Sequence, residues 1–328
     1  MSDQLIYAME VTLNGLMAGV LYALVALGFV LIYKASGIFN YAQGVMALFA
    51  AMTLVGIMNG QVPFSHLINA MFGTHIHHFG WHVPALIAII LTIGVMILLA
   101  WAVQYFVMRH LVNQEPIILF MATIGLAYFL EGLSDLMWGS EIKKLDVGLP
   151  QGINLWLDEV TFNIFGYGFF VDNLDIVATV IAALLVAALV AFSQYTKQGR
   201  AMRAVADDHQ AALSVGISLN YIWVMVWSVA GFVALVAGIV WGTKSGVQFS
   251  LSLIALKALP VLMLGGFTSI PGAIVGGLII GVGEKLFDFL IGPMIGGATE
   301  NWFAYVLALV FLVFRPQGLF GEKIIERV

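Results

Sequence analysis

The chain has no cysteine and very little charge. Its 328 residues include no Cys, and only 9% are Asp, Glu, Lys or Arg. The absence of cysteine excludes disulfides, thiol catalysis and cysteine-based metal sites. Soluble domains have about 25% charged and about 45–50% apolar residues, whereas 62% of this chain is hydrophobic. A soluble core cannot absorb that excess, so the composition predicts a polytopic protein of the lipid bilayer.

Motifs of hydrolytic sites are missing as well. The chain has no HExxH, and in GTKSG (242–246) Thr243 stands where a phosphate loop needs the glycine before its lysine. No nucleophile–base set is recognisable either. We therefore expect no enzyme activity, no cofactor and no nucleic-acid partner, and any ATP that drives the protein has to be bound by another subunit.

A loop rich in histidine, at residues 58–83, is the one stretch that suggests a metal. It holds five of the seven histidines, with His78 and His82 four residues apart, and such tracts can bind metal ions. The stretch contains no carboxylate. We expect a solvated loop rather than a metal site.

Nine apolar runs have, or nearly have, the length of about 20 residues that a membrane-crossing helix needs. Unpaired strands cannot span lipid, and the alternating segments of a barrel are absent. The fold class is therefore all-α, with about 8–10 transmembrane helices because three runs are short or interrupted. The first run follows MSDQLIYAME, which has no basic residue, so we expect a retained span rather than a signal peptide. The runs are 11–33, 37–57, 84–108, 117–138, 174–195, 220–242, 250–265, 271–291 and 302–314.

Lysine and arginine set the expected orientation. With nine spans and the N-terminus outside, eight basic residues fall on the cytoplasmic side and three on the outer side. Loops 58–83 and 139–173 then face outward, and 197–216 faces the cytoplasm. The cytoplasmic set is Lys34, Arg109, Lys197, Arg200, Arg203, Arg315, Lys323 and Arg327, and the outer set is Lys143, Lys144 and Lys244.

The segment 197–216, KQGRAMRAVADDHQAALSVG, is a polar insertion with helix-forming composition between two apolar runs. A polar helix held between two spans is poorly placed to bind lipid. It is well placed to contact a soluble partner, and its arginines suit such contacts because the planar guanidinium binds carboxylates bidentately. The alternative is an ordinary solvated loop.

A second polar stretch, residues 36–46 (SGIFNYAQGVM), interrupts the second apolar run. Asn40 and Gln43 offer uncharged hydrogen-bonding groups, and Gly44 allows a close backbone approach. Discontinuous membrane helices often present such groups to a solute, so we assign these three residues to a substrate pathway. A polar contact between helices is an equally good explanation.

A third interruption lies in 257–284, KALPVLMLGGFTSIPGAIVGGLIIGVGE. We expect Pro260 to break the seventh span and GGFTSIPG to form a tight turn. Lys257 and Glu284 lie about 10 Å from the outer ends of their spans, where an isolated charge is costly. We predict that they are neighbours, as an ion pair that fixes helix register or as part of the substrate pathway.

Two kinds of residue pair at regular helical spacing, glycine pairs and an acidic pair, have ordinary explanations beside functional ones. Glycines four residues apart, as in Gly15/Gly19 and Gly277/Gly281, allow helices to pack closely and also to slide. Glu131 and Asp135, near the outer end of the fourth span, are either common acidic residues at a membrane exit or a means of attracting cations.

These segments together resemble the LivH-like permease subunits of bacterial branched-chain amino acid ABC importers. The resemblance covers nearly the whole chain. It departs at Gln43, where family members often have histidine in N-F-A-H-G and this chain reads N-Y-A-Q-G. It is strongest at 15–33 running into 37–44, at ATIGLAYFL (122–130), at 196–206 with 211–217, and at 257–284.

The resemblance implies a single permease domain over 1–328 in the bacterial inner membrane. It implies two cytoplasmic ABC ATPase subunits, a second related permease or a second copy of this chain, and a periplasmic substrate-binding protein. It also implies that 197–216 is a coupling helix that docks into an ATPase. The residues assigned to that role are Gly199, Arg200, Arg203, Ala204, Ala211 and Gly216.

Other functions remain open at this point. The resemblance also leaves the substrate open, because close relatives in the family import urea, short amides or other small amino acids. A stand-alone secondary transporter would need carboxylates within the membrane for ion coupling, and Glu284 is the only deep acidic candidate.

Overall fold

The computed structural model describes residues 3–73, 78–111, 114–207, 209–297 and 299–321. The chain forms two compact units. The first comprises residues 1–30, 149–190 and 256–328, and the second comprises 31–148 and 191–255. Several residues used in the predictions lie outside the described part: His75, His77, Asp208, Lys323 and Arg327.

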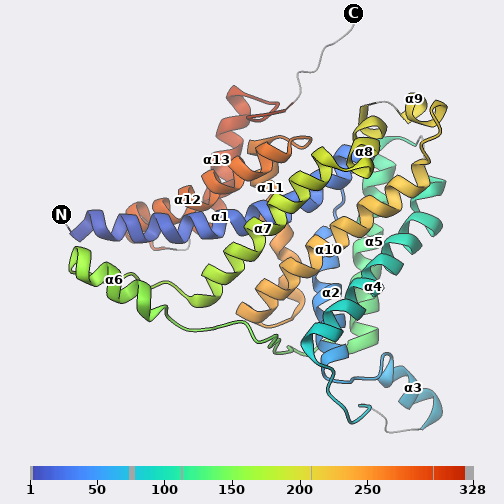
Figure 1. The fold of residues 1–328 in the computed structure, drawn as a ribbon, viewed down its shortest axis with the longest axis horizontal. Coiled ribbons are helices and arrows are strands. Elements are labelled where there is room, and N and C mark those ends of the chain that lie inside the picture. Colours follow the sequence, from blue (N-terminus) through green and yellow to red (C-terminus); the bar gives the residue numbers. More distant parts are fainter. Residues whose placement is uncertain (1–2, 74–77, 112–113, 208, 298, 322–328) are drawn as a thin grey trace, which may run out of the picture. The chain divides into compact units, whose positions relative to one another are not determined.

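All nine predicted apolar runs contain helices (Figure 1). Within the described residues there is no strand, only isolated bridges such as that between Lys143 and Val247. The nine helices are α1 (Asp3–Ser36), α2 (Gln43–Met58), α4 (Ala85–Phe106), α5 (Pro116–Trp138), α7 (Asn173–Tyr195), α10 (Leu219–Ser245), α11 (Ile254–Gly265), α12 (Ile270–Ile295) and α13 (Glu300–Phe314). Shorter elements connect them: α3 (Ser65–Phe72), α6 (Leu155–Phe165), α8 (Lys197–Asp207), α9 (His209–Ser214), and the 3-10 turns η1 (Met108–His110) and η2 (Phe249–Leu253).

Length separates these helices into two groups. Among the described residues, five are long and apolar enough to cross a bilayer alone: α1, α4, α5, α7 and α10. The segments 249–265 and 270–295 pass the same test together but are bent by 114° at the turn between them, which makes six spans if the pair is one span. Helices α2 and α13 are apolar but shorter. This is fewer than the predicted 8–10 spans, because the breaks that interrupted the apolar runs also shorten the helices.

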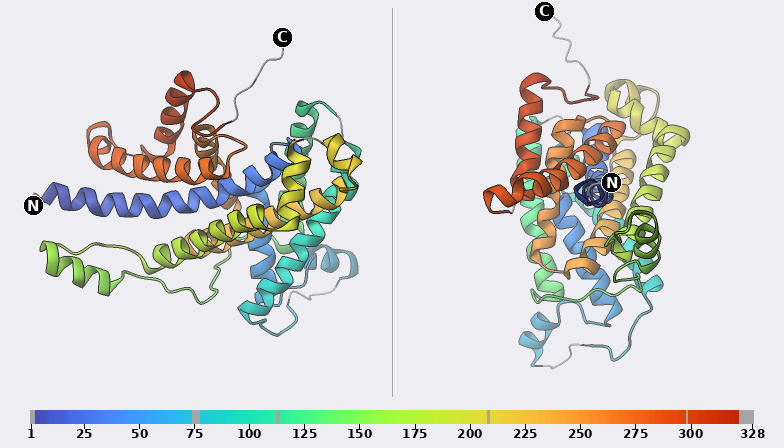
Figure 2. Two further views of the ribbon diagram at one scale, coloured as in Figure 1. Left: turned by 45° about the horizontal axis from the view of Figure 1, so that its top comes forward. Right: turned by 90° about the vertical axis from the view of Figure 1, so that its left-hand side faces the viewer.

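In the second unit, α10 packs against α2 and α4, and α2 also packs against α5. Figure 2 gives two further views of these helices as ribbons. Hydrogen bonds join them at both ends of the group. At one end Gln104 Nε2 donates to Asn220 Oδ1 over 3.2 Å. At the other, the Val83 amide donates to the Met58 carbonyl over 3.0 Å. The end that holds Met58 also holds the last turn of α5.

In the first unit, α1 packs against α12 through the predicted glycines. A Cβ at Gly19 would lie 2.7 Å from the Gly277 carbonyl oxygen, and a Cβ at Gly277 would lie 2.6 Å from that of Gly19. A Cβ at Gly15 would lie 2.9 Å from the Gly281 carbonyl oxygen. Real Cβ atoms do not approach that closely, so the glycines serve close packing, as the sequence indicated.

The prediction that Pro260 breaks the seventh span is wrong. Pro260 lies inside α11, which runs from Ile254 to Gly265. Proline removes the amide that would bond the carbonyl four residues earlier, here that of Leu256. That carbonyl instead accepts a hydrogen bond from the Tyr305 hydroxyl over 2.7 Å. A side chain distant in sequence thus satisfies the group that proline leaves free.

The predicted tight turn after α11 is confirmed. Helix α11 ends at Gly265, and α12 begins at Ile270. Gly266 has φ +103°, a conformation that favours glycine. The Ser269 hydroxyl accepts from the Gly272 amide over 3.0 Å and so caps the start of α12.

Candidate functional site

The predicted break in the second apolar run lies at residues 37–42, between α1 and α2. Asn40 Oδ1 accepts from the Ala42 amide over 3.1 Å, and its Nδ2 donates to Gln43 Oε1 over 3.2 Å. Gln43 Nε2 donates in turn to the Ala230 carbonyl of α10, also over 3.2 Å. Both side chains are fully buried. Their amides therefore fix the start of α2 and tie it to α10.

Gly44 and Thr123 hold the same break against its neighbours in the second unit. A Cβ at Gly44 would collide with the Ser252 carbonyl of η2. The Thr123 hydroxyl donates to the Phe39 carbonyl and accepts from the Tyr41 amide, each over 3.1 Å. Thr123 was not predicted as a site residue, although its hydroxyl within the apolar segment 122–130 was a visible signal.

Lys257 and Glu284 are neighbours, as predicted. Lys257 Nζ lies 2.5 Å from Glu284 Oε1 and also donates to the Glu300 carbonyl over 3.0 Å. The Glu284 side chain is only 1% exposed, and its Oε2 has no hydrogen-bond partner among the described residues. Beside this pair, Lys285 Nζ and Glu300 Oε1 form a more exposed salt bridge of 2.7 Å. The ion pair lies in the first unit, whereas Asn40 and Gln43 lie in the second.

The predicted helix within 197–216 exists as α8 and α9, but its first turns face α7. Arg203 Nη1 donates to the Ser193 carbonyl over 2.7 Å, and Arg200 Nη1 donates to the Tyr195 carbonyl over 3.3 Å. A Cβ at Gly199 would collide with the Ser193 carbonyl. The last carbonyls of a helix lack intrahelical donors, and cations there are favourable. Gly199 and Arg203 thus fix α8 against the end of α7.

Other residues assigned to this segment reach the surface of the second unit. Ala211 and Gly216 are exposed, Arg200 is exposed, and Ala204 is half-buried. Leu213 and Val215 are exposed apolar residues nearby. The exposed side of α8 and α9 therefore combines positive charge with apolar groups.

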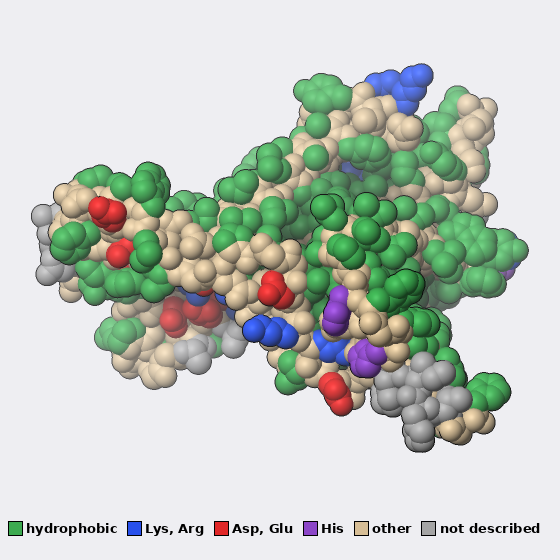
Figure 3. Space-filling model, turned by 60° about the horizontal axis from the view of Figure 1, so that its bottom comes forward, with side chains coloured by type: hydrophobic (Ala, Val, Ile, Leu, Met, Phe, Trp, Pro, Cys, Tyr) green, Lys and Arg blue, Asp and Glu red, His purple; other side chains and the backbone are tan. Residues whose placement is uncertain are grey.

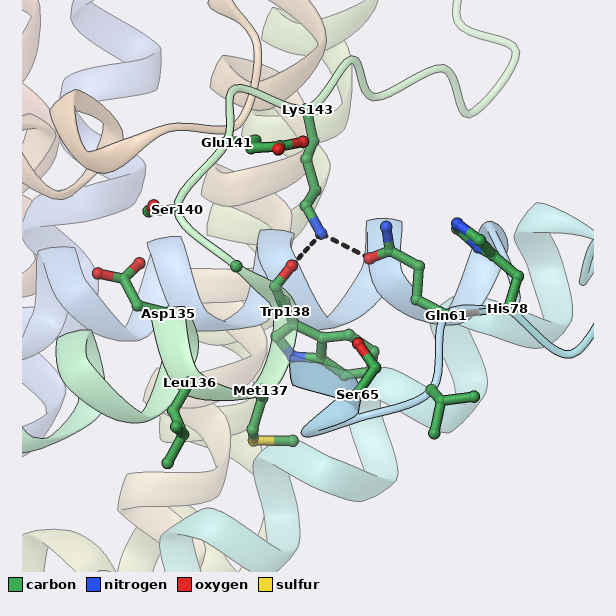
Figure 4. A pocket seen from close by; sticks show the side chains of 12 residues that line it. Gln61, Ser65, His78, Asp135, Leu136, Met137, Trp138, Ser140, Glu141 and Lys143 are labelled. Atoms are coloured by element: carbon green, nitrogen blue, oxygen red, sulfur yellow. Dashed lines mark hydrogen bonds between the residues drawn. The ribbon is translucent and has the colours of Figure 1, made fainter. Parts of the chain in front are cut away.

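A pocket that the sequence did not reveal lies at the other end of the second unit (Figure 4). Its volume is about 590 Å³. Acidic, basic and histidine side chains gather on part of the face drawn in Figure 3, within a largely apolar surface. The lining residues are Gln61, Val62, Ser65, His78, Asp135, Leu136, Met137, Trp138, Gly139, Ser140, Glu141 and Lys143.

Lys143 is the buried charge of this pocket. Its Nζ donates to Gln61 Oε1 and to the Trp138 carbonyl, each over 2.5 Å (Figure 4). Burial lowers the pKa of its ammonium group below the usual lysine value, and the nearby Glu141 carboxylate partly opposes that effect. Its backbone pairs with Val247 in both directions, which fixes the loop after α5.

His78 lines the pocket, but no metal centre accompanies it. Among the described residues, no group of three or more His, Asp or Glu side chains is arranged to hold a metal ion. Asp135 lines the pocket, whereas Glu131, its predicted partner in attracting cations, does not.

The helices define a multi-pass membrane protein. A family model described as "Branched-chain amino acid transport system / permease component" matches residues 11–315. The chain therefore belongs to this family. Family membership implies ATPase and substrate-binding partners in general, and an inner-membrane location.

Individual relatives agree with this assignment. The high-affinity branched-chain amino acid transport system permease protein LivH of Salmonella typhimurium is 27% identical over 338 residues, covering 100% of both chains. Its counterpart BraD of Pseudomonas aeruginosa is 28% identical and covers 99% of both. The autoinducer 2 import system permease protein LsrC of Salmonella paratyphi B is 30% identical, over 49% of this chain and 42% of its own length.

Proposed function

We propose that the chain is the transmembrane permease subunit of an ABC importer that carries branched-chain or other small amino acids inward. The observation that carries the proposal is its likeness to LivH over 100% of both chains. The whole of 1–328 acts as one permease domain. The chain has no ATPase site of its own, since GTKSG forms the end of helix α10 with the glycine that follows it, and lacks the required glycine before its lysine.

The partners in this proposal are two cytoplasmic ATPase subunits, a second related permease or a second copy of this chain, and a periplasmic substrate-binding protein. An importer of urea, short amides or another small polar solute is the alternative. The match to LsrC over 49% of this chain supports this alternative, because LsrC is named for import of autoinducer 2 rather than of an amino acid.

The segment 197–216 acts as the coupling loop. Closure of the ATPase pair on ATP pushes the exposed side of α8 and α9. Because Arg203 and Gly199 fix α8 against the end of α7, the push reaches α7 rather than being lost in a flexible loop. Helix α10 follows the coupling loop directly, so the C-terminal end of the loop transmits the motion to α10.

The pathway residues have two kinds of role in this proposal. Asn40, Gln43 and Gly44 shape the break between α1 and α2. The side-chain amides of Asn40 and Gln43 are already occupied by hydrogen bonds within the protein. Lys257 and Glu284 form the charged contact of the bent pair α11 and α12. Both clusters position the helices that border the solute path.

Docking of an ATPase at α9 is testable by crosslinking, because the chain has no native cysteine. A single cysteine at the exposed Ala211 (Ala211→Cys) is expected to crosslink to an ATPase subunit through a short bismaleimide in membranes of the producing cell. The matched variant is Asp146→Cys, also exposed but on the predicted outer side. Crosslinking at position 146 and not at 211 would refute the proposed orientation and the coupling role together.

A further inference from the structure

The pocket at the end of α5 is part of no role described so far. It lies where α5 ends, beside the loop that leads from α2 into α3, and all of its lining residues belong to the second unit. Its volume of about 590 Å³ falls within the range of about 300–1,000 Å³ that is typical of small-molecule sites. The charge count places it on the outer side.

Lys143 supplies an anion-binding group that is not saturated. The side chain is only 9% exposed. A lysine ammonium has three donors, and the structure uses two of them, on Gln61 and on the Trp138 carbonyl. No described residue accepts the third. A buried donor without an acceptor is costly, so the site favours a ligand that brings an acceptor, such as a carboxylate.

Asp135 and Glu141 supply charge of the opposite sign. Both carboxylates line the pocket and are exposed. Neither forms a salt bridge with a described residue. In Figure 4 Glu141 lies beside Lys143, and Asp135 lies apart from it on the side of Trp138 away from His78. They are able to accept hydrogen bonds from an ammonium group, and charge-assisted bonds of this kind are the strong ones.

Apolar groups complete the lining. Val62, Leu136 and Met137 contribute to the same pocket. A ligand that satisfies all three features carries a carboxylate, an ammonium group and an aliphatic side chain.

We propose that this pocket binds a zwitterionic aliphatic amino acid, with its carboxylate on Lys143, its ammonium on the carboxylate of Asp135 or of Glu141, and its side chain against Val62 and Met137. The inference rests on the proposed function and adds to it an entry subsite on the outer side of the permease. The subsite is separate from the buried clusters around Gln43 and around Lys257.

Equilibrium binding of tritiated L-leucine to the full-length permease in lipid nanodiscs tests the site. Unlabelled leucine is expected to displace the label at least about tenfold better than 4-methylpentanoate, which lacks the ammonium, or 3-methylbutylamine, which lacks the carboxylate. The double variant Asp135→Asn/Glu141→Gln is expected to weaken leucine binding by about tenfold or more. The matched control is Glu131→Gln, one turn from Asp135 but outside the lining, which should leave binding unchanged.

Lys143→Met removes the proposed carboxylate contact but also frees Gln61 and the Trp138 carbonyl, so it requires a check of folding by thermal unfolding. If Lys143→Met misfolds, the double variant Asp135→Asn/Glu141→Gln provides the test. Unchanged leucine binding in the double variant, or equal displacement by the three ligands, would overturn the site. A third result would also overturn the site: the permease does not bind leucine, and the variants lower only its affinity for the substrate-binding protein. That result would assign the pocket to protein docking.

The same variants separate failure of the site from failure of the proposed function. If the complete transporter takes up leucine with ATP equally well in the wild type and the double variant, the subsite is refuted and the proposed function stands. If the wild-type complex binds leucine in this pocket but does not take it up, the site stands and the proposed function is contradicted.

Discussion

Replacing Lys257 by methionine is expected to lower the free energy of unfolding by about 3–5 kcal/mol. The variant leaves the Glu284 carboxylate, which is 1% exposed, without its ion-pair partner. The second oxygen of Glu284, Oε2, already has no hydrogen-bond partner among the described residues. Lys257 also bonds the Glu300 carbonyl at the start of α13. Unfolding of the purified permease by SDS in mixed micelles measures the change.

Two further variants show whether burial of the charge is the cause. Lys257→Met/Glu284→Gln removes both charges and is expected to recover a large part of the lost stability. Lys285→Met breaks the neighbouring salt bridge to Glu300, whose side chain is 37% exposed, and such pairs contribute about 0–1 kcal/mol. Equal losses for Lys257→Met and Lys285→Met would contradict the account of the buried pair.

Replacing Gly199 by valine is expected to reduce ATP-driven uptake by about 5- to 150-fold. A side chain at Gly199 collides with carbonyl groups at the end of α7, so α8 has to move away from its position. Overpacking of this kind costs about 1–3 kcal/mol, and a coupling free energy of that size corresponds to about 5–150-fold. Uptake and ATP hydrolysis measured together in the same proteoliposomes show whether hydrolysis continues without transport.

The matched control is Gln198→Val, at the preceding residue of the same helix. It introduces the same β-branched side chain but at an exposed position. Uptake by this variant should stay near that of the wild type. A similar loss in both variants would mean that helix propensity, rather than contact between α8 and α7, explains the effect.

The helices were predictable because lipid leaves so few choices. An apolar run of sufficient length has to satisfy its backbone internally, and all nine runs contain helices. The turn between α11 and α12 was equally clear from the segment GGFTSIPG. The pairing of Lys257 with Glu284 followed from the cost of an isolated charge at that depth.

Other features depended on contacts that the sequence does not display. The helix survives at Pro260 because Tyr305, distant in sequence, donates to the exposed carbonyl. Asn40 and Gln43 were visible as polar groups, but only the fold shows that α10 occupies the Gln43 amide. Arg203 was expected to face a partner, yet its guanidinium bonds the end of its own preceding helix. The pocket around Lys143 is lined by residues of 61–78 and of 135–143. Because these segments are distant in sequence, no local sequence pattern predicts the pocket.

The central claim is that this chain forms a solute path and takes its energy from another protein. Uptake of tritiated leucine into proteoliposomes tests it most directly, with the chain reconstituted alone or with its permease, ATPase and substrate-binding partners. The account predicts uptake only when ATP and all partners are present, and none for the chain alone under any imposed proton or sodium gradient. Gradient-driven uptake by the chain alone would contradict it.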